Sequence, residues 1–435
     1  MQRFEDLDDP RRQTGRFQYP LQELLLTALC AVAAGAEDWV DVSEWGEFKL
    51  EWLRRFLPFE RGIASHDTFS RVFAMLDSVR FEACFRSWMA QICPSLAQEH
   101  IAIDGKTLRG SRTADGALHL VTAWHCGKGV TLGQIRTQAK SNEITAIPEL
   151  LAGLDLRGAT VTMDAMGCQK AIVQQLVDEG AGYIIGVKNN QPTLAQAVQG
   201  LLEQAPARAD GRTWHEHSET DKGHGRIETR RCVVCHDLSA IAPVLQDWPG
   251  VRSVVLVQST RQPVRSGRFG PRSTEQAPEP SWRYYISSEV LDAQAFNATI
   301  RAHWAIENDC HWVLDVNYRE DACLIRRDHG PHNMATLRRI AQNQIKLDAS
   351  KGSQKTKRKR MGWSDDYLQG GTSRNLPCSP EPGLRLHKSS AGEQLMSAAR
   401  RCPHRRGTPR RVFPPHAGCA DAPALLTSHT SRRAL

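Results

Sequence analysis

Long hydrophobic runs are missing from this chain of 435 residues, and their absence limits where the protein can work. The longest apolar stretch, residues 24–35, is about half the length that a membrane-spanning helix needs. The first residues, MQRFED, are polar and acidic, so no secretory signal is expected there. The 12 cysteines are irregularly spaced, which is typical of reduced thiols rather than a disulfide framework. We therefore expect a soluble, cytoplasmic protein without a membrane partner.

An even distribution of positive charge is also missing. The formal net charge is +8, but residues 351–435 carry 17 Lys+Arg and 5 Asp+Glu, whereas the rest of the chain carries 39 and 43. The body is thus mildly acidic, and any nucleic-acid site in it must be a local patch. Pro, Gly, Ser and Arg dominate after Leu368 without a hydrophobic period. Residues 351–435 are therefore predicted to be a basic, disordered tail, and the basic cluster 355–360 suits either non-specific phosphate binding or a solvated tail.

The remaining chain divides into two regions by its hydrophobic pattern. Residues 1–95 are predicted to form an all-helical N-terminal domain, with helices at 21–34, 44–56, 65–76 and 81–92. A helix-turn-helix that reads DNA is one interpretation, and a helical bundle or dimerisation element is the other. Residues 96–350 give the order βββαβαβα, which favours an α/β fold: an RNase H-like mixed sheet with flanking helices. A β-rich insertion interrupts it at about 205–280, and one long helix is expected at 292–316.

Three acidic residues stand where they could meet. Asp104 and Asp164 each follow an apolar strand, and strand ends lie at the sheet edge where α/β folds bind ligands. Glu307 lies in the middle of the predicted helix 292–316. Hard divalent cations prefer oxygen ligands, and a pair of such ions can activate the attacking oxygen and stabilise the leaving one in phosphodiester chemistry. One alternative is structural: the two aspartates form turns at strand ends, and the glutamate belongs to an ordinary salt bridge. Another is a hydrolase whose paired carboxylates act as general acid and base without metal.

Several motifs occur in order and resemble the bacterial insertion-sequence DDE transposases of the H-repeat-associated type. The segment 103–111 (IDGKTLRGS) is similar to the first-aspartate motif, 162–170 to the second, and 187–191 (VKNNQ) to the Lys-x-Asn-Gln segment. The segment 221–228 matches a stretch of the insertion, and 303–316 resembles the glutamate motif. The resemblance covers roughly residues 5 to 368, and the N-terminal helices resemble the domain that accompanies this group.

The resemblance implies a bacterial, nucleoid-associated enzyme in which Asp104, Asp164 and Glu307 hold Mg²⁺ or Mn²⁺. It implies DNA cleavage and strand transfer at terminal inverted repeats, with double-stranded DNA as partner and a homodimer or higher oligomer on that DNA. A broader transposase group has Tyr, Arg and Lys where this chain has Ile300, His303 and Leu314, so hairpin-handling roles are not carried over. The 67 residues after Leu368 have no counterpart, which leaves a catalytically inactive DNA-binding relic as the alternative.

Ten further residues are predicted to contact DNA. Basic side chains near strand ends could bind phosphates, which position DNA without reading its sequence; otherwise they are solvated charges. Asn190 and Gln191 orient DNA or cap the next helix, and the glycine-containing basic loop at 223–226 is either a DNA contact or a hairpin turn. Residues flanking Glu307 touch the scissile phosphate or pack on the helix surface. The residues concerned are Lys106, Arg109, Lys188, Asn190, Gln191, His224, Arg226, Arg301, His303 and Asn308. Trp304 and Trp312 are predicted to share a helix face in the core.

Overall fold

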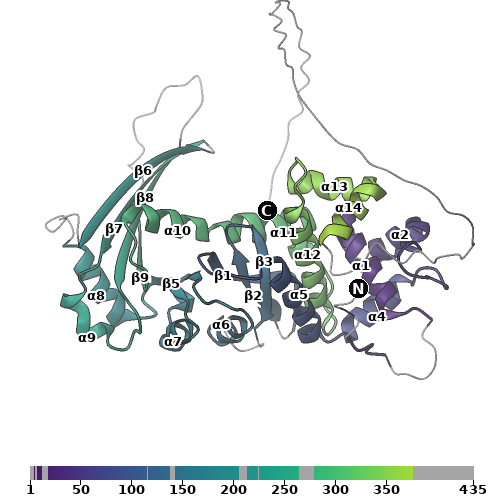
Figure 1. Ribbon diagram of the computed structural model, residues 1–435, viewed down its shortest axis with the longest axis horizontal. Coiled ribbons are helices and arrows are strands. Elements are labelled where there is room, and N and C mark those ends of the chain that lie inside the picture. The colour runs from purple at the N-terminus through teal and green to yellow at the C-terminus, as the bar shows by residue number, and fades with distance from the viewer. Residues whose placement is uncertain are drawn as a thin grey trace, which may run out of the picture. The chain divides into compact units, whose positions relative to one another are not determined.

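The structure is a computed structural model that describes residues 4, 7–11, 18–114, 116–137, 143–204, 213–223, 225–263 and 279–375, with side chains up to residue 370 (Figure 1). Residues Met1–Glu381 form one compact unit, and the architecture below is that of this unit. None of the helices in the described ranges is long and apolar enough to cross a membrane.

The described strands form one nine-stranded mixed sheet in the order β3-β2-β1-β4-β5-β9-β8-β7-β6. Neighbours β1 and β4, and likewise β4 and β5, are parallel, and every other pair is antiparallel. This arrangement confirms the predicted mixed sheet and is consistent with an RNase H-like fold. The strands are β1 His100–Thr113, β2 Gly116–His125, β3 Val130–Arg136, β4 Thr160–Met163, β5 Gly182–Val187, β6 Trp214–Gly223, β7 Arg226–Cys235, β8 Ser253–Pro263 and β9 Ser281–Ser287.

The predicted β-rich insertion continues the same sheet. Strand β9 pairs with β5, and β8, β7 and β6 follow outward as antiparallel neighbours, as Figure 1 shows. The strands β7 and β9 are exposed where they begin and buried where they end, whereas β6 at the sheet edge is mostly exposed. Residues 205–212, 224 and 264–278 of this region lie outside the described residues, and with them the predicted contact His224.

Helices cover both faces of the sheet. Side chains alternate along β1, so Asp104 and Lys106 face the segments after α10, whereas a Cβ on Gly105 would meet Glu143 at the start of α6. The helices are α1 Leu21–Ala34, α2 Trp39–Phe48, α3 Leu50–Leu53, α4 His66–Met75, α5 Ser78–Ile92, α6 Glu143–Ala152, α7 Lys170–Asp178, α8 Pro192–Leu202, α9 Ala242–Leu245, α10 Ala293–His303, α11 Trp312–Tyr318, α12 Gly330–Leu347, α13 Gln354–Trp363 and α14 Asp365–Asn375. Short 3₁₀ turns are η2 Ala165–Gly167, η4 Ser239–Ile241 and η6 Glu320–Ala322, and η5 Ile306–His311 is a π-helix.

The N-terminal helices share a hydrophobic core with the sheet and with α12. Helix α1 is apolar on nearly all sides, and most of its residues are buried, because α2, α12 and α13 surround it. The expected helix at 44–56 is wrong in its bounds: α2 starts at Trp39, where the Asp38 carboxylate accepts hydrogen bonds from the amides of Val40 and Asp41. It ends at Phe48, whose ring is 86% exposed. The DNA-reading interpretation of these helices stays a prediction.

The expected tail boundary at residue 351 is wrong, because α13 and α14 belong to the compact unit. Met361 and Leu368 are fully buried. The Arg358 guanidinium donates to the carbonyls of Val32 and Ala36 at the end of α1 and lies over the Tyr318 ring. Backbone carbonyls at a helix end lack partners within the helix, so a buried arginine can satisfy them. Part of the basic cluster at 355–360 is therefore structural, which composition alone did not indicate.

Candidate active site

Asp104 and Asp164 are brought together by two parallel strands. The last paired residues of β1 and β4 are Ile103 and Met163, so the two aspartates follow side by side. Strand β4 ends there, and the Asp164 carboxylate accepts a hydrogen bond from the Met166 amide at 2.9 Å, which caps η2. Strand β1 does not end at Asp104 as expected but continues to Thr113 on β2 alone. The end of β4, rather than of β1, creates the opening.

Glu307 lies on a π-turn instead of the expected continuous helix. Helix α10 ends at His303, η5 carries Glu307, and α11 begins at Trp312. A π-turn inside a helix is uncommon and often marks a functional site. Because the wider turn changes the angular spacing of the following residues, Trp304 and Trp312 do not share a core face. Trp312 is 59% exposed, so the prediction that it is a core residue is wrong, whereas Trp304 is half-buried beneath the Arg283 guanidinium.

The three acids line one cavity of about 140 Å³. Its walls come from β4, β5, β9 and α10, and the lining includes Lys188, Trp282 and His303. Burial, followed by the negative charges of Glu143, Asp164 and Glu307, raises the pKa of the Asp104 carboxyl to about 7, although a hydrogen bond from the Gly105 amide lowers it. Besides the three acids of this cavity, Glu143 lies against Gly105, the residue after Asp104.

Two residues outside the predicted triad sit next to Asp104. His311 on η5 places Nδ1 3.5 Å from Asp104 Oδ2 and is buried, and burial lowers the pKa of this imidazole to about 3. Glu143 lies against Gly105 and is held by His119, whose Nε2 is 2.9 Å from the carboxylate. His311 lies four residues after Glu307 and is one of the residues that flank it in the sequence, for which helix-surface packing was the alternative. The sequence places Glu143 at the start of a helix and contains no motif that would have indicated its position beside Asp104.

Comparison with known proteins decides the family. The family model described as Transposase DDE domain matches residues 95–344, and DDE_Tnp_1-associated matches residues 1–89. The chain belongs to the DDE transposase family.

Two relatives named as transposases are similar along most of this chain, and a third is similar along a short part of it. One, from Escherichia coli O157:H7, is named "Putative transposase YncI": it is 39% identical over 363 residues, which are 82% of this chain and 90% of that protein. Another, from E. coli K12, is named "H repeat-associated putative transposase YhhI", with 37% identity over 82% of this chain and 93% of that protein. A third, named "Inactive transposase YbfQ", also from E. coli K12, is 43% identical over 61 residues, 14% of this chain and 73% of that protein. The expected resemblance to the H-repeat-associated type is confirmed.

The DDE domain positions the Asp164 loop through two residues that were expected to touch DNA or to cap a helix. The Asn190 amide donates to the Ala165 carbonyl at 2.7 Å, and the Gln191 amide donates to the Cys168 carbonyl at 3.0 Å. Gln191 makes no side-chain cap on α8. Both residues therefore tie the start of α8 to η2. Lys188, two residues before Asn190, is exposed and lines the acidic cavity.

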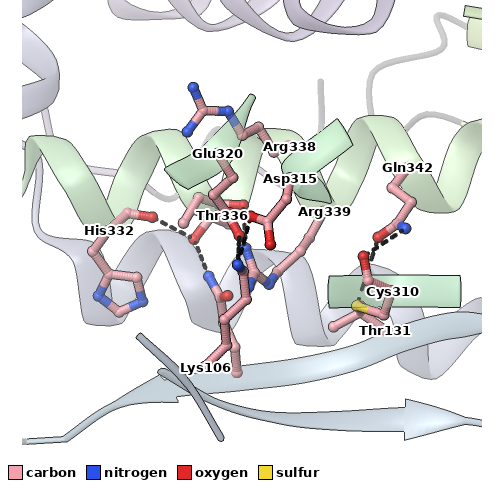
Figure 2. Close-up of polar contacts among 12 residues, drawn as sticks. Lys106, Thr131, Cys310, Asp315, Glu320, His332, Thr336, Arg338, Arg339 and Gln342 are labelled. Atoms are coloured by element: carbon pink, nitrogen blue, oxygen red, sulfur yellow. Dashed lines mark hydrogen bonds and ion pairs between the residues drawn. The ribbon is translucent and has the colours of Figure 1, made fainter. Parts of the chain in front are cut away.

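Lys106 does not lie where a DNA phosphate could reach it. The residue is 8% exposed, and its ammonium donates to Asp315 Oδ1 at 2.6 Å and to Asp321 Oδ1 at 3.5 Å. A Glu320 carboxylate oxygen lies 4.0 Å from the Lys106 ammonium, and the other oxygen of this carboxylate is 2.8 Å from the Arg339 guanidinium. Figure 2 shows these side chains together. An ammonium already surrounded by carboxylates is not free to bind another anion, so the structure argues against the predicted phosphate contact.

The other predicted DNA contacts are dispersed. Arg109 is exposed beside Asp321, and Asn308 is exposed with its amide donating to the Trp304 carbonyl. Arg301 pairs with two carboxylates of β6, Glu219 and Asp221. These three lie on the surface but are not brought together by the described structure.

Two more predicted contacts are held by protein partners. Arg226 opens β7 beside Glu228. His303 is buried, with Nδ1 2.8 Å from the Thr162 hydroxyl, and burial lowers the pKa of this imidazole to about 4. It therefore joins α10 to β4, so direct contact with a phosphate is not its evident role.

The donor set fits a hard divalent cation. Asp104, Asp164 and Glu307 offer only oxygen ligands, and their mutual repulsion is what a bound cation would relieve. Among the described residues, however, no three His, Cys, Asp or Glu side chains lie close enough to enclose an ion. Glu307 is exposed on its π-turn, so it is the member of the triad with space to adjust.

Proposed function

We propose that this family member is a transposase that cleaves DNA at the inverted repeats of an insertion sequence and joins the ends to a target. One observation carries the proposal: three carboxylates from β1, the end of β4 and a π-turn line one cavity in a DDE domain. Asp104, Asp164 and Glu307 would hold Mg²⁺ or Mn²⁺. The bound metal would activate the attacking oxygen and stabilise the leaving one.

The surrounding residues have separate tasks in this proposal. Lys188 is exposed at the cavity and can bind a non-bridging phosphate oxygen. His311 is buried beside Asp104, with Nδ1 3.5 Å from Oδ2, and would limit the space in which that carboxylate can move. Asn190 and Gln191 hold η2 and so fix Asp164. The RNase H-like core would act on double-stranded DNA, with at least two copies of the chain pairing the transposon ends.

Cleavage of a labelled transposon-end duplex tests the proposal. Wild type, Asp104→Asn and Glu307→Gln are compared with Mg²⁺, Mn²⁺ or EDTA. The matched control is Asp309→Asn, because Asp309 lies on the same π-turn but points to Lys346 and does not line the cavity. We expect metal-dependent nicking at the element boundary, a loss of at least about 100-fold in the two site variants, and little change in the control.

Other outcomes decide against the proposal. Cleavage that survives Asp104→Asn would remove the catalytic assignment, and cleavage in EDTA would favour a metal-independent hydrolase. A folded wild type that binds the duplex but never cuts it would support the inactive relic.

A further inference from the structure

A second, larger cavity of about 850 Å³ is lined by other residues than the acidic cavity. It runs between the β1–β2 hairpin and the segment 326–332. Met166 and Glu143 line its inner end. Met166 is the residue whose amide binds the Asp164 carboxylate, and Glu143 lies against Gly105, next to Asp104. The cavity, called here the arginine groove, therefore borders the segments that carry Asp104 and Asp164, although the three proposed catalytic carboxylates line the other cavity.

Positive side chains lie along the arginine groove. Arg136, Arg326 and Arg327 line it and are exposed. Within the described chain, Arg136 and Arg326 have no carboxylate within ion-pair distance, whereas Arg327 is 3.4 Å from Asp328. The body of this chain is net acidic, so unpaired arginines grouped beside the site form the kind of local patch that an anionic polymer requires.

The start of α12 contributes a second feature. This helix of 18 residues opens into the arginine groove with Pro331 in its first turn and without a side-chain cap. The Gly330 amide donates to the Arg327 carbonyl, the Asn333 amide donates to the His329 carbonyl, and Pro331 has no N–H, so the start of α12 attracts an anion mainly through the helix dipole.

The His332 side chain points independently to a missing ligand. It lines the arginine groove and is only 4% exposed, and neither ring nitrogen has a hydrogen-bond partner among the described residues. In Figure 2 its ring points away from the Lys106 ion-pair network. Buried polar groups in proteins nearly always have a partner, so this unpartnered imidazole in the lining of the arginine groove indicates a ligand that would bind it.

We infer that the arginine groove binds the phosphate backbone of the DNA whose strand enters the acidic cavity. The inference rests on the proposed function and names the surface that holds its substrate. Small residues on the β1–β2 hairpin, Ser111, Gly116 and Ala117, leave room for a backbone to approach. Phosphates bound at Arg136 and Arg326 would fix the register of the strand relative to Asp104 and Asp164.

DNA binding measured without metal tests this inference separately from catalysis. Fluorescence anisotropy in EDTA compares a transposon-end duplex with an unrelated duplex of equal length, over a series of salt concentrations. The variants are Arg136→Glu and Arg326→Glu. The matched control is Arg157→Glu, which makes the same charge change on a side chain 80% exposed just before β4, at the opposite end of that strand from Asp164.

We expect each groove variant to weaken binding of both duplexes about tenfold and to reduce the slope of log Kd against log salt by about one, because each loses a phosphate contact. The control should bind like wild type. His332→Phe keeps the ring volume and removes its nitrogens, so weaker binding at an unchanged Tm would support the ligand role without depending on the arginine variants.

Wild-type affinity in the groove variants would overturn the inference. If they bind normally and Lys188→Glu does not, the DNA crosses the acidic cavity from the β5 side instead. If the groove variants bind normally and metal-dependent cleavage persists, only the DNA-binding role of the arginine groove is wrong, and the proposed function stands. If wild type neither binds nor cuts the duplex, both the inference about the groove and the proposed function fail.

Discussion

Replacing Glu82 by glutamine should make the protein more stable at neutral pH. Glu82 lies on α5 and is 3% exposed. Its carboxylate accepts a hydrogen bond from the backbone amide of Gln134 on β3 at 2.9 Å and another from the Thr336 hydroxyl on α12 at 3.1 Å. It therefore joins the N-terminal helices to the DDE domain. Burial raises its pKa from 4.5 to about 7, against the hydrogen bonds and the nearby charges of Arg86 and Arg339.

The sign of the pH effect follows from this raised pKa. Between pH 4.5 and about 7, the folded state keeps a proton that the unfolded state has released, so stability falls as pH rises through this window. A shift of this size corresponds to at most about 3 kcal/mol, at about 1.4 kcal/mol per pKa unit. Glutamine remains neutral, accepts from the Gln134 amide and donates to the Thr336 hydroxyl. The penalty at high pH is thereby removed while both contacts are kept.

Urea unfolding at pH 5 and pH 8, followed by tryptophan fluorescence, measures the effect. We expect Glu82→Gln to exceed wild type by less than about 1 kcal/mol at pH 5, just above the unfolded pKa, and by up to about 3 kcal/mol at pH 8. The exposed Glu51→Gln is the control for a general charge effect. An equal difference at both pH values, or a variant less stable than wild type at pH 8, would refute the assigned cause.

Two further perturbations test how the site and the C-terminal helices are held. Asn190→Ala removes the hydrogen bond to the Ala165 carbonyl, so we expect about a tenfold loss of cleavage at an unchanged Tm; Asn189→Ala is the exposed neighbouring control, and equal losses in both would contradict the positioning role. Truncation at the end of the compact unit should leave the melting transition intact, whereas truncation after α12 should lower it, because the buried side chains of Met361 and Leu368 contribute about 1.5–3 kcal/mol each. Calorimetry that found identical transitions for the two truncations would show that α13 and α14 do not stabilise the core.

The parts of the fold that the sequence predicted are those with a strong local pattern. The apolar segments before Asp104 and Asp164 predicted strands, and the topology of the βββαβαβα order then placed β1 beside β4. The DDE family match confirms the family that the ordered motifs indicated. Helix α1 was predicted with its bounds because its composition is apolar on all sides.

The remaining features depend on contacts between distant residues. The π-turn around Glu307 forms where Cys310 packs against Thr131 and Gln342, and local spacing cannot show those partners. Lys106 looked like a solvated strand-end charge, yet carboxylates about 210 residues later in the chain surround it. Helix α13 has no hydrophobic period, because Arg358 reaches the end of α1 through its guanidinium.

The β-rich insertion contributes to the acidic cavity through the strands that support β9. Strand β9 pairs with β5 so that Tyr284 lies opposite Val187, the residue before Lys188. Trp282 and Tyr284 consequently form one wall of the acidic cavity. Since β9 is also paired with β8 along its whole length, this wall depends on the outer strands. The distance between that wall and Glu307 on its π-turn sets the width of the cavity at the carboxylates. The insertion therefore helps to shape the cavity as well as to extend the sheet.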